Sequence, residues 1–278
     1  LMGTLFSVTC HHPDAALVEK AVAAAFAEAE AINACASDYI ADSELLSLSK
    51  QPVGTPVVVS PRLFKLVNEA RDLAEKTHGA FDPTLGPLTK LWRESRRRKA
   101  LPDPESLAAA KAASGWQHLI LDPEKSTATF NVPDMRLDLG GIAKGQAADA
   151  MLAVLKSHGI SSASVTAGGD VRVGDPPPDA KGWQVGVRTF DKEKDATTLF
   201  LSNGAVSTSG SLQQTIEIDG VHYAHIIDPS TGLGLTKPVA ATVLAPTSAT
   251  SDALATACCI LPREEASKLC RSLKARLL

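Results

Sequence analysis

Apolar residues recur every three to four positions in several stretches of the chain, a spacing typical of amphipathic helices. The stretch at 60–78 has the clearest boundaries, because Ser60 suits the N-cap position, Pro61 suits the first turn and Gly79 ends the helix. The sequence therefore predicts helices at 14–36, 60–78, 104–113 and 143–157, and a final helical region over 251–274.

Short runs of alternating or β-branched residues predict strands between these helices. They cover 4–9, 117–121, 128–132, 162–166, 183–188, 198–201, 214–218, 221–227 and 240–244. Hairpin-like strands interspersed with helices favour an α+β fold, with mixed, largely antiparallel sheets and flanking helices, over a doubly wound parallel sheet. No stretch has the composition of a linker. We therefore expect a single domain over 1–278, built as two closely packed lobes.

Composition and charge narrow the classes of function. The chain has 278 residues, of which 44% are hydrophobic, enough for a sizeable core. A formal net charge of −3 with 21% charged residues gives no sign of a nucleic-acid partner. No apolar run approaches the length of a transmembrane helix. The five cysteines lack the paired spacing of a zinc site, so we expect buried thiols at Cys258 and Cys259.

The stretch 138–145, Asp-Leu-Gly-Gly-Ile-Ala-Lys-Gly, leads from a strand into the helix at 143–157. Glycines before a helix start let backbone N–H groups approach a ligand, and a helix N-terminus favours an anion such as phosphate. Lys144 adds a positive charge in the first turn. The stretch is neither a Walker loop nor a G-x-G-x-x-G, and a tight turn with a solvated lysine explains it equally well.

Asp252 and Thr256 are four residues apart in the last helical region, so their oxygens project from one helix face. A carboxylate and a hydroxyl one turn apart form half a site for a hard cation, which carbonyl oxygens or water would complete. The alternative is an ordinary helix start, with Ser251 as the N-cap and Asp252 favoured by the helix dipole.

The densest candidate chemistry lies in residues 223–232, Tyr-Ala-His-Ile-Ile-Asp-Pro-Ser-Thr-Gly. A strand-like lead ends there in a turn that presents His225 and Asp228 together, an arrangement common at catalytic sites. Three other stretches join it as candidates, each with a purely structural alternative: a cleft loop or plain connection at 79–87, a hairpin or ligand contact at 167–170, and hydroxyls just after a strand at 208–210.

Taken together and in order, these segments resemble the ApbE-type flavin transferases (FAD:protein FMN transferases). The resemblance covers nearly the whole chain and includes four further stretches: 2–4 (Met-Gly-Thr), 42–45 (Asp-Ser-Glu-Leu), 183–186 (Trp-Gln-Val-Gly) and 207–210 (Ser-Thr-Ser-Gly). It implies an α+β fold that holds FAD in a cleft between lobes. It also implies a reaction that uses Mg²⁺, in which FAD is split at its pyrophosphate, FMN is joined by a phosphoester to a threonine of an acceptor protein, and AMP is released.

The resemblance assigns roles residue by residue. Asp252 and Thr256 would bind the metal by side chain, and Gly141 and Ala255 by backbone oxygen. The positions that match FAD contacts are Met2, Tyr39, Ala80, Phe81, Asp82, Asp138, Lys144 and Ile226. His225 is the candidate general base, since histidine titrates near neutral pH. Asp228 would orient His225 or bind the acceptor.

The chain departs from the family pattern at three places: Gln146, where an aromatic residue is common, the stretch 211–214, and the stretch 48–50. These departures leave ring contacts and acceptor docking open. Two other functions also remain open, namely a hydrolase that converts FAD to FMN and AMP and a flavin-binding protein without catalysis. Family members are mostly exported and often lipid-tethered. The resemblance therefore implies an extracytoplasmic, periplasmic location, with any signal or anchor upstream of residue 1.

Overall fold

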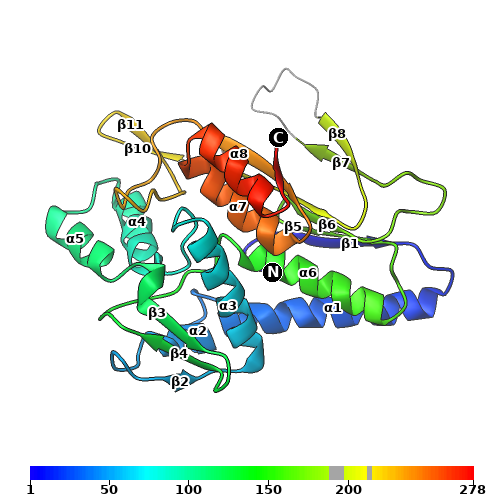
Figure 1. The fold of residues 1–278 in the computed structure, drawn as a ribbon, viewed down its shortest axis with the longest axis horizontal. Coiled ribbons are helices and arrows are strands. Elements are labelled where there is room, and N and C mark those ends of the chain that lie inside the picture. Colours follow the sequence, from blue (N-terminus) through cyan, green and yellow to red (C-terminus); the bar gives the residue numbers. More distant parts are fainter. Residues whose placement is uncertain (188–196, 212–214) are drawn as a thin grey trace.

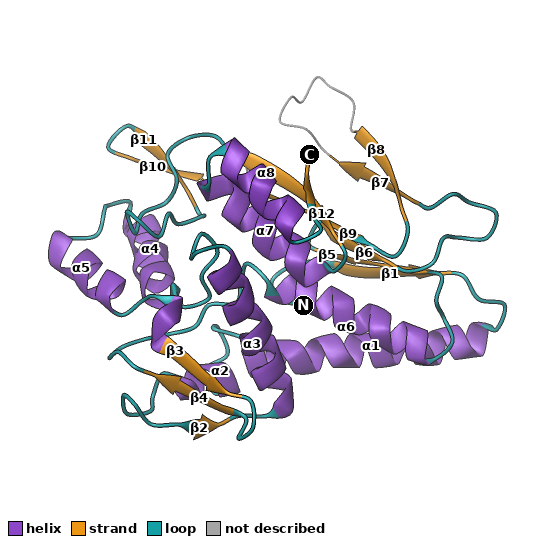
Figure 2. Ribbon diagram, in the orientation of Figure 1, coloured by secondary structure: helices purple, strands orange, loops and turns teal. Residues whose placement is uncertain are grey.

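A six-stranded antiparallel sheet forms the centre of the protein in the computed structural model, which describes residues 1–187, 197–211 and 215–278 (Figures 1 and 2). Its strands lie in the order β1 (Phe6–Cys10), β5 (Ala163–Ala167), β6 (Asp170–Val173), β9 (Ala205–Gly210), β12 (Ala240–Ala245) and β13 (Arg276–Leu277). β5 and β6 form a tight hairpin that opens at Ala167 and Asp170. Successive side chains of β5 point to opposite faces of the sheet, so every second one is buried.

Helices cover one face of this sheet. α6 (Ala143–Ser157) lies on β5 and β6, α7 (Ser248–Ile260) lies on β9 and β12, and α1 (Ala15–Ala36) packs against α6 as an outer layer (Figure 1). The hairpin of β7 (Trp183–Val187) and β8 (Thr197–Leu201) joins an apolar cluster with Val206 of β9.

A second group of elements gathers at the lower left of Figure 1. They are a three-stranded sheet of β2 (Val57–Val58), β4 (Thr127–Phe130) and β3 (Leu119–Asp122), the helices α2 (Glu44–Leu48), α3 (Pro61–Lys76), α4 (Gly86–Arg98) and α5 (Pro104–Ala112), and the short 3₁₀ helix η1 (Trp116–His118). One apolar core joins this group to α1 and α6, because buried residues such as Leu63, Leu119 and Leu152 belong to a single cluster. The two groups are therefore closely packed.

Two further elements complete the fold. The hairpin of β10 (Thr215–Ile218) and β11 (Val221–Ala224) packs on α4 through Trp92 and Tyr223, whose rings meet edge to face at 5.5 Å. α8 (Arg263–Ser272) follows α7. No helix of the described residues has the length and apolar character that crossing a membrane requires.

Most predicted helices lie within two residues of those observed, and Ser60 does cap α3, its Oγ accepting a hydrogen bond from Leu63 N. The final helical region over 251–274 is present, but Leu261 and Pro262 divide it into α7 and α8, since proline disfavours a helical residue before it. α4 was not predicted, because Pro87 suggested a loop, whereas proline is tolerated in a first helical turn.

The strand predictions place the main hairpins but miss β2, β6, β9 and β13. Residues 208–210 do not follow a strand but belong to β9 in the middle of the sheet. β11 ends at Ala224 rather than at residue 227. Three predictions fall outside the described residues. They are the last residue of the strand predicted at 183–188, the first residue of the strand predicted at 214–218, and the departure from the family pattern at 212–214.

Candidate functional site

A cavity of about 290 Å³ lies between the main sheet with its helices and the wall formed by α4. Six separate parts of the chain line it: the loop after α1, the loop after α3, α4, the turn before α6 with the first turn of that helix, β9 through Ser209, and the segment from β11 to α7. The sequence-predicted residues that it brings together are Tyr39, Ala80, Phe81, Asp82, Asp138, Gly141, Lys144, His225, Ile226, Asp252 and Thr256.

The inner end of the cavity holds a half-buried cation between two buried carboxylates. Lys144 Nζ lies 3.1 and 2.9 Å from the two carboxylate oxygens of Asp252 and 3.1 Å from Oδ2 of Asp170. Asp252 and Asp170 are 3% and 4% exposed. The Lys144–Asp170 contact is an ion pair without hydrogen-bond geometry, so Asp170 Oδ2 remains a buried oxygen with unused acceptor capacity.

Burial and neighbouring charges, taken together, raise the pKa values of both Lys144 and Asp170. Burial alone would lower the pKa of Lys144, but the Asp252 and Asp170 carboxylates beside it outweigh burial and raise that pKa. Burial, then repulsion from Asp252, raises the pKa of Asp170 to about 7. The two carboxylates therefore share a single ammonium group. The negative charge of this cluster that Lys144 leaves uncompensated favours binding of a further cation.

The donor set suits a hard divalent cation. Asp252 and Thr256 face the cavity from one side of α7, and Thr256 Oγ1 lies 3.3 Å from Ser209 Oγ of β9. A Cβ on Gly141 would lie 3.4 Å from Thr256 Oγ1, so the backbone at 141 approaches the hydroxyl closely. The described residues hold no group of three His, Cys, Asp or Glu side chains suited to a metal. Backbone oxygens, water and ligand phosphates would have to complete a shell, as Mg²⁺ accepts.

The sequence interpretation of the Asp252 helix start is corrected by the structure. Thr247, not Ser251, is the N-cap of α7, and its Oγ1 accepts from Thr250 N. Ser251 instead lies buried in the second turn, where its hydroxyl meets Ser207 Oγ of β9 at 2.8 Å. Asp252 therefore lies beyond the first turn of α7, so a favourable interaction with the helix dipole does not explain why an acid occupies this position.

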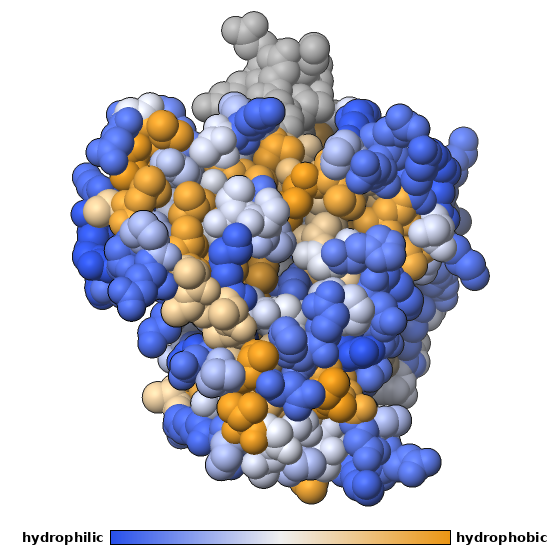
Figure 3. All heavy atoms as spheres, turned by 60° about the vertical axis from the view of Figure 1, so that its left-hand side comes forward, coloured by the Kyte–Doolittle hydropathy of each residue, from blue (hydrophilic) through white to orange (hydrophobic). Residues whose placement is uncertain are grey.

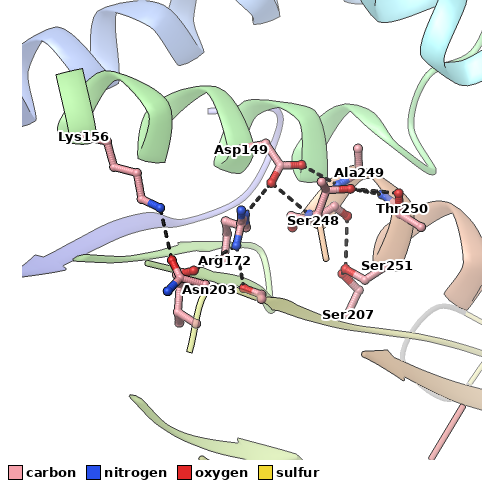
Figure 4. Close-up of polar contacts among 12 residues, drawn as sticks. Asp149, Lys156, Arg172, Asn203, Ser207, Ser248, Ala249, Thr250 and Ser251 are labelled. Atoms are coloured by element: carbon pink, nitrogen blue, oxygen red, sulfur yellow. Dashed lines mark hydrogen bonds and ion pairs between the residues drawn. The ribbon is translucent and has the colours of Figure 1, made fainter. Parts of the chain in front are cut away.

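Asp149, in the middle of α6, joins that helix to the N-terminal end of α7 (Figure 4), an arrangement that we call the Asp149 bracket. Its two oxygens accept hydrogen bonds from Ser248 N at 3.0 Å and Ala249 N at 2.8 Å, and Arg172 Nε of β6 donates to it at 2.6 Å. The carboxylate therefore binds the free N–H groups of α7 from α6. The bracket thus connects α6, which carries Lys144, to α7, which carries Asp252.

Gly145 allows that close approach. A Cβ at this position would collide with the backbone carbonyl of Ser248. Only glycine therefore lets the first turn of α6 contact the first turn of α7. At Gln146, where the resemblance had left ring contacts open, the side chain points away from the cavity: its Nε2 donates to Leu66 O at 2.9 Å and to Glu69 Oε2 at 3.0 Å.

The loop after α3 forms one wall of the cavity. Thr77 Oγ1 accepts a hydrogen bond from Phe81 N at 3.1 Å, which holds the Phe81 ring near Gly141. Asp82 lines the cavity, but its carboxylate accepts hydrogen bonds from both the N–H and the hydroxyl of Thr84 and from Trp116 N. The carboxylate of Asp82 thus organises its own loop rather than facing a ligand with free oxygens.

Arg93 of α4, which sequence reasoning missed, organises the opposite wall. Its guanidinium forms ion pairs with Asp38 and, at 3.1 Å, with Asp138, and it stacks 4.3 Å from the centre of the Tyr39 ring. Gly140 N donates to the other oxygen of Asp138 at 2.8 Å. Arg93 therefore orients two residues that the resemblance assigns to FAD. No sequence motif marked it, because α4 itself was not predicted.

His225 stands exposed at the cavity, one residue after β11. Trp92 Nε1 donates to the carbonyl of Ala224 at 3.0 Å, which fixes the chain just before His225. Asp228 caps its own turn: Oδ1 accepts from the N–H and the hydroxyl of Ser230. The turn predicted from the Asp-Pro-Ser-Thr-Gly sequence is thus present, although β11 stops before His225.

Three predicted residues are absent from the described lining of the cavity: Met2, Asp228 and Ala255. Met2 packs against the large apolar core, and Ala255 is wholly buried inside α7. Asp228 lines a neighbouring cavity of about 630 Å³ that shares Ala80 with the first. Ala255 could therefore contribute to the cavity only through its backbone. Asp228 lies beside the cavity rather than in its lining.

Sequence reasoning left a hairpin and a ligand contact both open at 167–170; the hairpin of β5 and β6 is present, and it delivers the buried Asp170 carboxylate to Lys144. Ser209, one of the candidate hydroxyls at 208–210, lines the cavity from β9, and Arg96 lines it without having been singled out. A buried acid directly after two glycines was the signal that could have found Asp170.

A sequence model described as the ApbE family matches residues 2–277. Relatives called FAD:protein FMN transferase include one from Treponema pallidum, 37% identical over 83% of this chain and 68% of that protein, and one from Klebsiella pneumoniae, 33% identical over 97% and 79%.

Two solved structures have the same fold. The ApbE protein from Thermotoga maritima is 29% identical with a TM-score of 0.89, covering 100% of this chain and 91% of that one. The flavin transferase ApbE from Vibrio cholerae is 30% identical with a TM-score of 0.87, covering 99% and 89%.

Proposed function

Because the chain belongs to the ApbE family, we propose that it is an Mg²⁺-dependent FAD:protein FMN transferase whose acceptor is a threonine of another protein. The observation that supports this most directly is the convergence, in one cavity, of His225 with Asp252, Thr256 and Lys144. A protein that only stores a flavin has no need of a base beside a buried charged centre.

The reaction joins the acceptor to the FMN half of FAD. The threonine oxygen attacks the FMN-side phosphorus, its proton passes to His225, and the bond from that phosphorus to the bridging oxygen breaks, so that AMP leaves. Phosphoryl transfer depends mainly on positioning and on neutralising charge. Mg²⁺ would supply that neutralisation at the diphosphate, held by the side chains of Asp252 and Thr256 and by backbone oxygen at Gly141 and Ala255.

The other side chains bind and orient. Lys144 places a second positive charge beside the Asp252 carboxylate, where it can contact a phosphate. Tyr39, held by Arg93, offers a ring face for a flavin or adenine ring. Asp138, held by the same guanidinium and by Gly140 N, would contact FAD from the turn before α6.

The test is incubation of the protein with FAD, Mg²⁺ and a candidate acceptor protein, followed by a denaturing gel. We expect flavin fluorescence that stays with the acceptor band and AMP release in equal amount. AMP release without a labelled acceptor, across several acceptors, would instead identify a hydrolase in which water replaces the threonine. FAD bound without any AMP release would reject both enzymatic functions.

A further inference from the structure

The chain is acidic overall but carries a concentrated basic region on α4. Residues 90–99 include Lys90, Arg93, Arg96, Arg97, Arg98 and Lys99, with Glu94 as the only acid among them, whereas the whole chain has a net charge of −3. The face of the molecule that carries α4, α5 and the β10–β11 hairpin comes forward in Figure 3, where hydrophilic residues surround small apolar patches. We refer to Lys90, Arg96, Arg97, Arg98, Lys99 and Arg136 as the α4 basic surface.

Internal ion pairs neutralise little of this charge. Arg97 and Arg98 share the single carboxylate of Glu94, at 4.0 and 3.2 Å. Within the described part of the chain, no ion pair involves Lys90, Arg96, Lys99 or Arg136. Arg96 and Arg136 are moreover half-buried. Half-buried guanidinium groups without a carboxylate partner favour an anionic ligand.

The α4 basic surface adjoins the FAD cavity. Arg96 lines that cavity directly. On the other side of Arg93, which lines both hollows, a second hollow of about 300 Å³ is bordered by Lys90, Arg97 and Arg136, with Asp38 and Glu94 as its only acids in the described lining. A polypeptide that brings a threonine to His225 can therefore extend across α4 without leaving the protein surface.

We propose that the α4 basic surface docks an acidic segment of the acceptor protein, next to the threonine that receives FMN. This inference rests on the proposed function. Charge complementarity identifies the partner segment as rich in Asp and Glu. A lipid surface is disfavoured because α4 exposes little apolar surface as an anchor for a bilayer: Leu88 and Trp92 are buried and Leu91 is half-buried.

We expect the α4 basic surface to affect the association of the acceptor protein with this protein, and not the rate of the transfer step. Exposed pairs each contribute little, but several like charges around one cleft raise the local concentration of an oppositely charged segment and its association rate. Salt screens such an attraction over about 10 Å at 0.1 M ionic strength. Docking should therefore weaken as ionic strength rises, while binding of FAD in its cavity changes less.

The test uses FAD-loaded protein and two fluorescent synthetic peptides. Both carry the same central threonine, one flanked by Asp and Glu and the other by Asn and Gln. The variant combines Lys90→Glu with Arg97→Glu, neither of which lines the FAD cavity. The control combines Lys20→Glu with Lys181→Glu, two exposed lysines elsewhere that give the same change of net charge. Fluorescence anisotropy gives each Kd at low and at physiological ionic strength, and flavin fluorescence gives the Kd of FAD.

We expect the unaltered protein to bind the acidic peptide at least about tenfold more tightly than the amide peptide at low ionic strength, the variant to lose this preference, and the control to keep it. The proposal is overturned if the preference is absent, if it survives in the variant, or if the control loses it equally. A parallel loss of FAD affinity, or binding of anionic vesicles in place of the peptide, would also overturn it. Absence of covalent flavin labelling would count against the proposed function alone, because peptide docking is measured without transfer.

Discussion

The two ends of the cavity are built in different ways. At the inner end, Lys144, Asp170 and Asp252 come from α6, β6 and α7, and the two carboxylates are buried. At the α4 wall, by contrast, most cations follow one another along a single helix, and Arg97 and Arg98 are 78% and 58% exposed. Tertiary packing creates the first arrangement, whereas local sequence creates the second.

The difference has a physical consequence. Buried charges interact strongly, and removal of one partner leaves the others uncompensated. Exposed charges are screened by water and salt, so that single changes have small effects. Substitutions at the inner end should therefore abolish a step, while substitutions at the α4 wall should adjust an affinity.

The largest effect should come from Asp252→Ala. Among the described residues it removes the one carboxylate that both contacts Lys144 and faces the cavity, so we expect loss of transfer on the order of 10³-fold and a much higher Mg²⁺ requirement. The measurements are the rate of acceptor labelling against Mg²⁺ concentration, and Mg²⁺ binding by calorimetry in the presence of FAD. An unchanged magnesium titration would remove Asp252 from the metal site.

His225→Ala should have the next largest effect. Loss of a general base lowers a rate by about 10² to 10⁴-fold, while FAD binding should persist because the cavity walls remain. The matched control is His222→Ala, an exposed histidine on β11 that lies 3.8 Å from Glu217 and does not line the cavity. Equal transfer rates in the two variants would exclude His225 as the base.

Asp149→Asn tests whether the bracket between α6 and α7 positions the inner end. The variant loses the ion pair with Arg172 and one carboxylate acceptor at the start of α7, so we expect about 3 kcal/mol lower stability in urea unfolding. Magnesium affinity should fall as well, because the distance from Lys144 to Asp252 is no longer held.

The control for this bracket is Asp14→Ala, which removes the N-cap of α1, a helix that contributes nothing to the described cavity lining. It should lower stability by about 1 kcal/mol and leave magnesium affinity unaltered. If Asp149→Asn also left magnesium affinity unaltered, the bracket would stabilise the fold without positioning the site.

Arg93→Gln should give the smallest of these effects. It frees Asp138 and Tyr39 but leaves the inner end intact, so we expect FAD affinity to fall by about five- to tenfold with little change in the rate at saturating FAD. Flavin fluorescence quenching measures the affinity, and Arg93→Lys keeps the charge without the planar stack. If the lysine variant matched the original protein, charge alone would explain the role of Arg93.

Local sequence predicted some elements well because their signals are local. The cap, the apolar stripe and the terminating glycine of α3 all lie within twenty residues, and α6 begins and ends where its periodicity indicates. α4 escaped because a charged helix with few apolar positions and an early Gly-Pro resembles a loop. β9 escaped because its alanine, serine and glycine residues give a weak strand signal, although the sheet places Ser207 against α7.

Sequence alone therefore determined the α+β class, the family resemblance, the turn at Asp228 and the residue types for a hard cation and a phosphate. Only tertiary structure decided that Asp170 would join Lys144, that Arg93 would hold Tyr39 and Asp138, and that Asp149 would join α6 to α7. These contacts connect residues many positions apart. Their energies depend on burial and on distance in space, neither of which is written in the local order of residues.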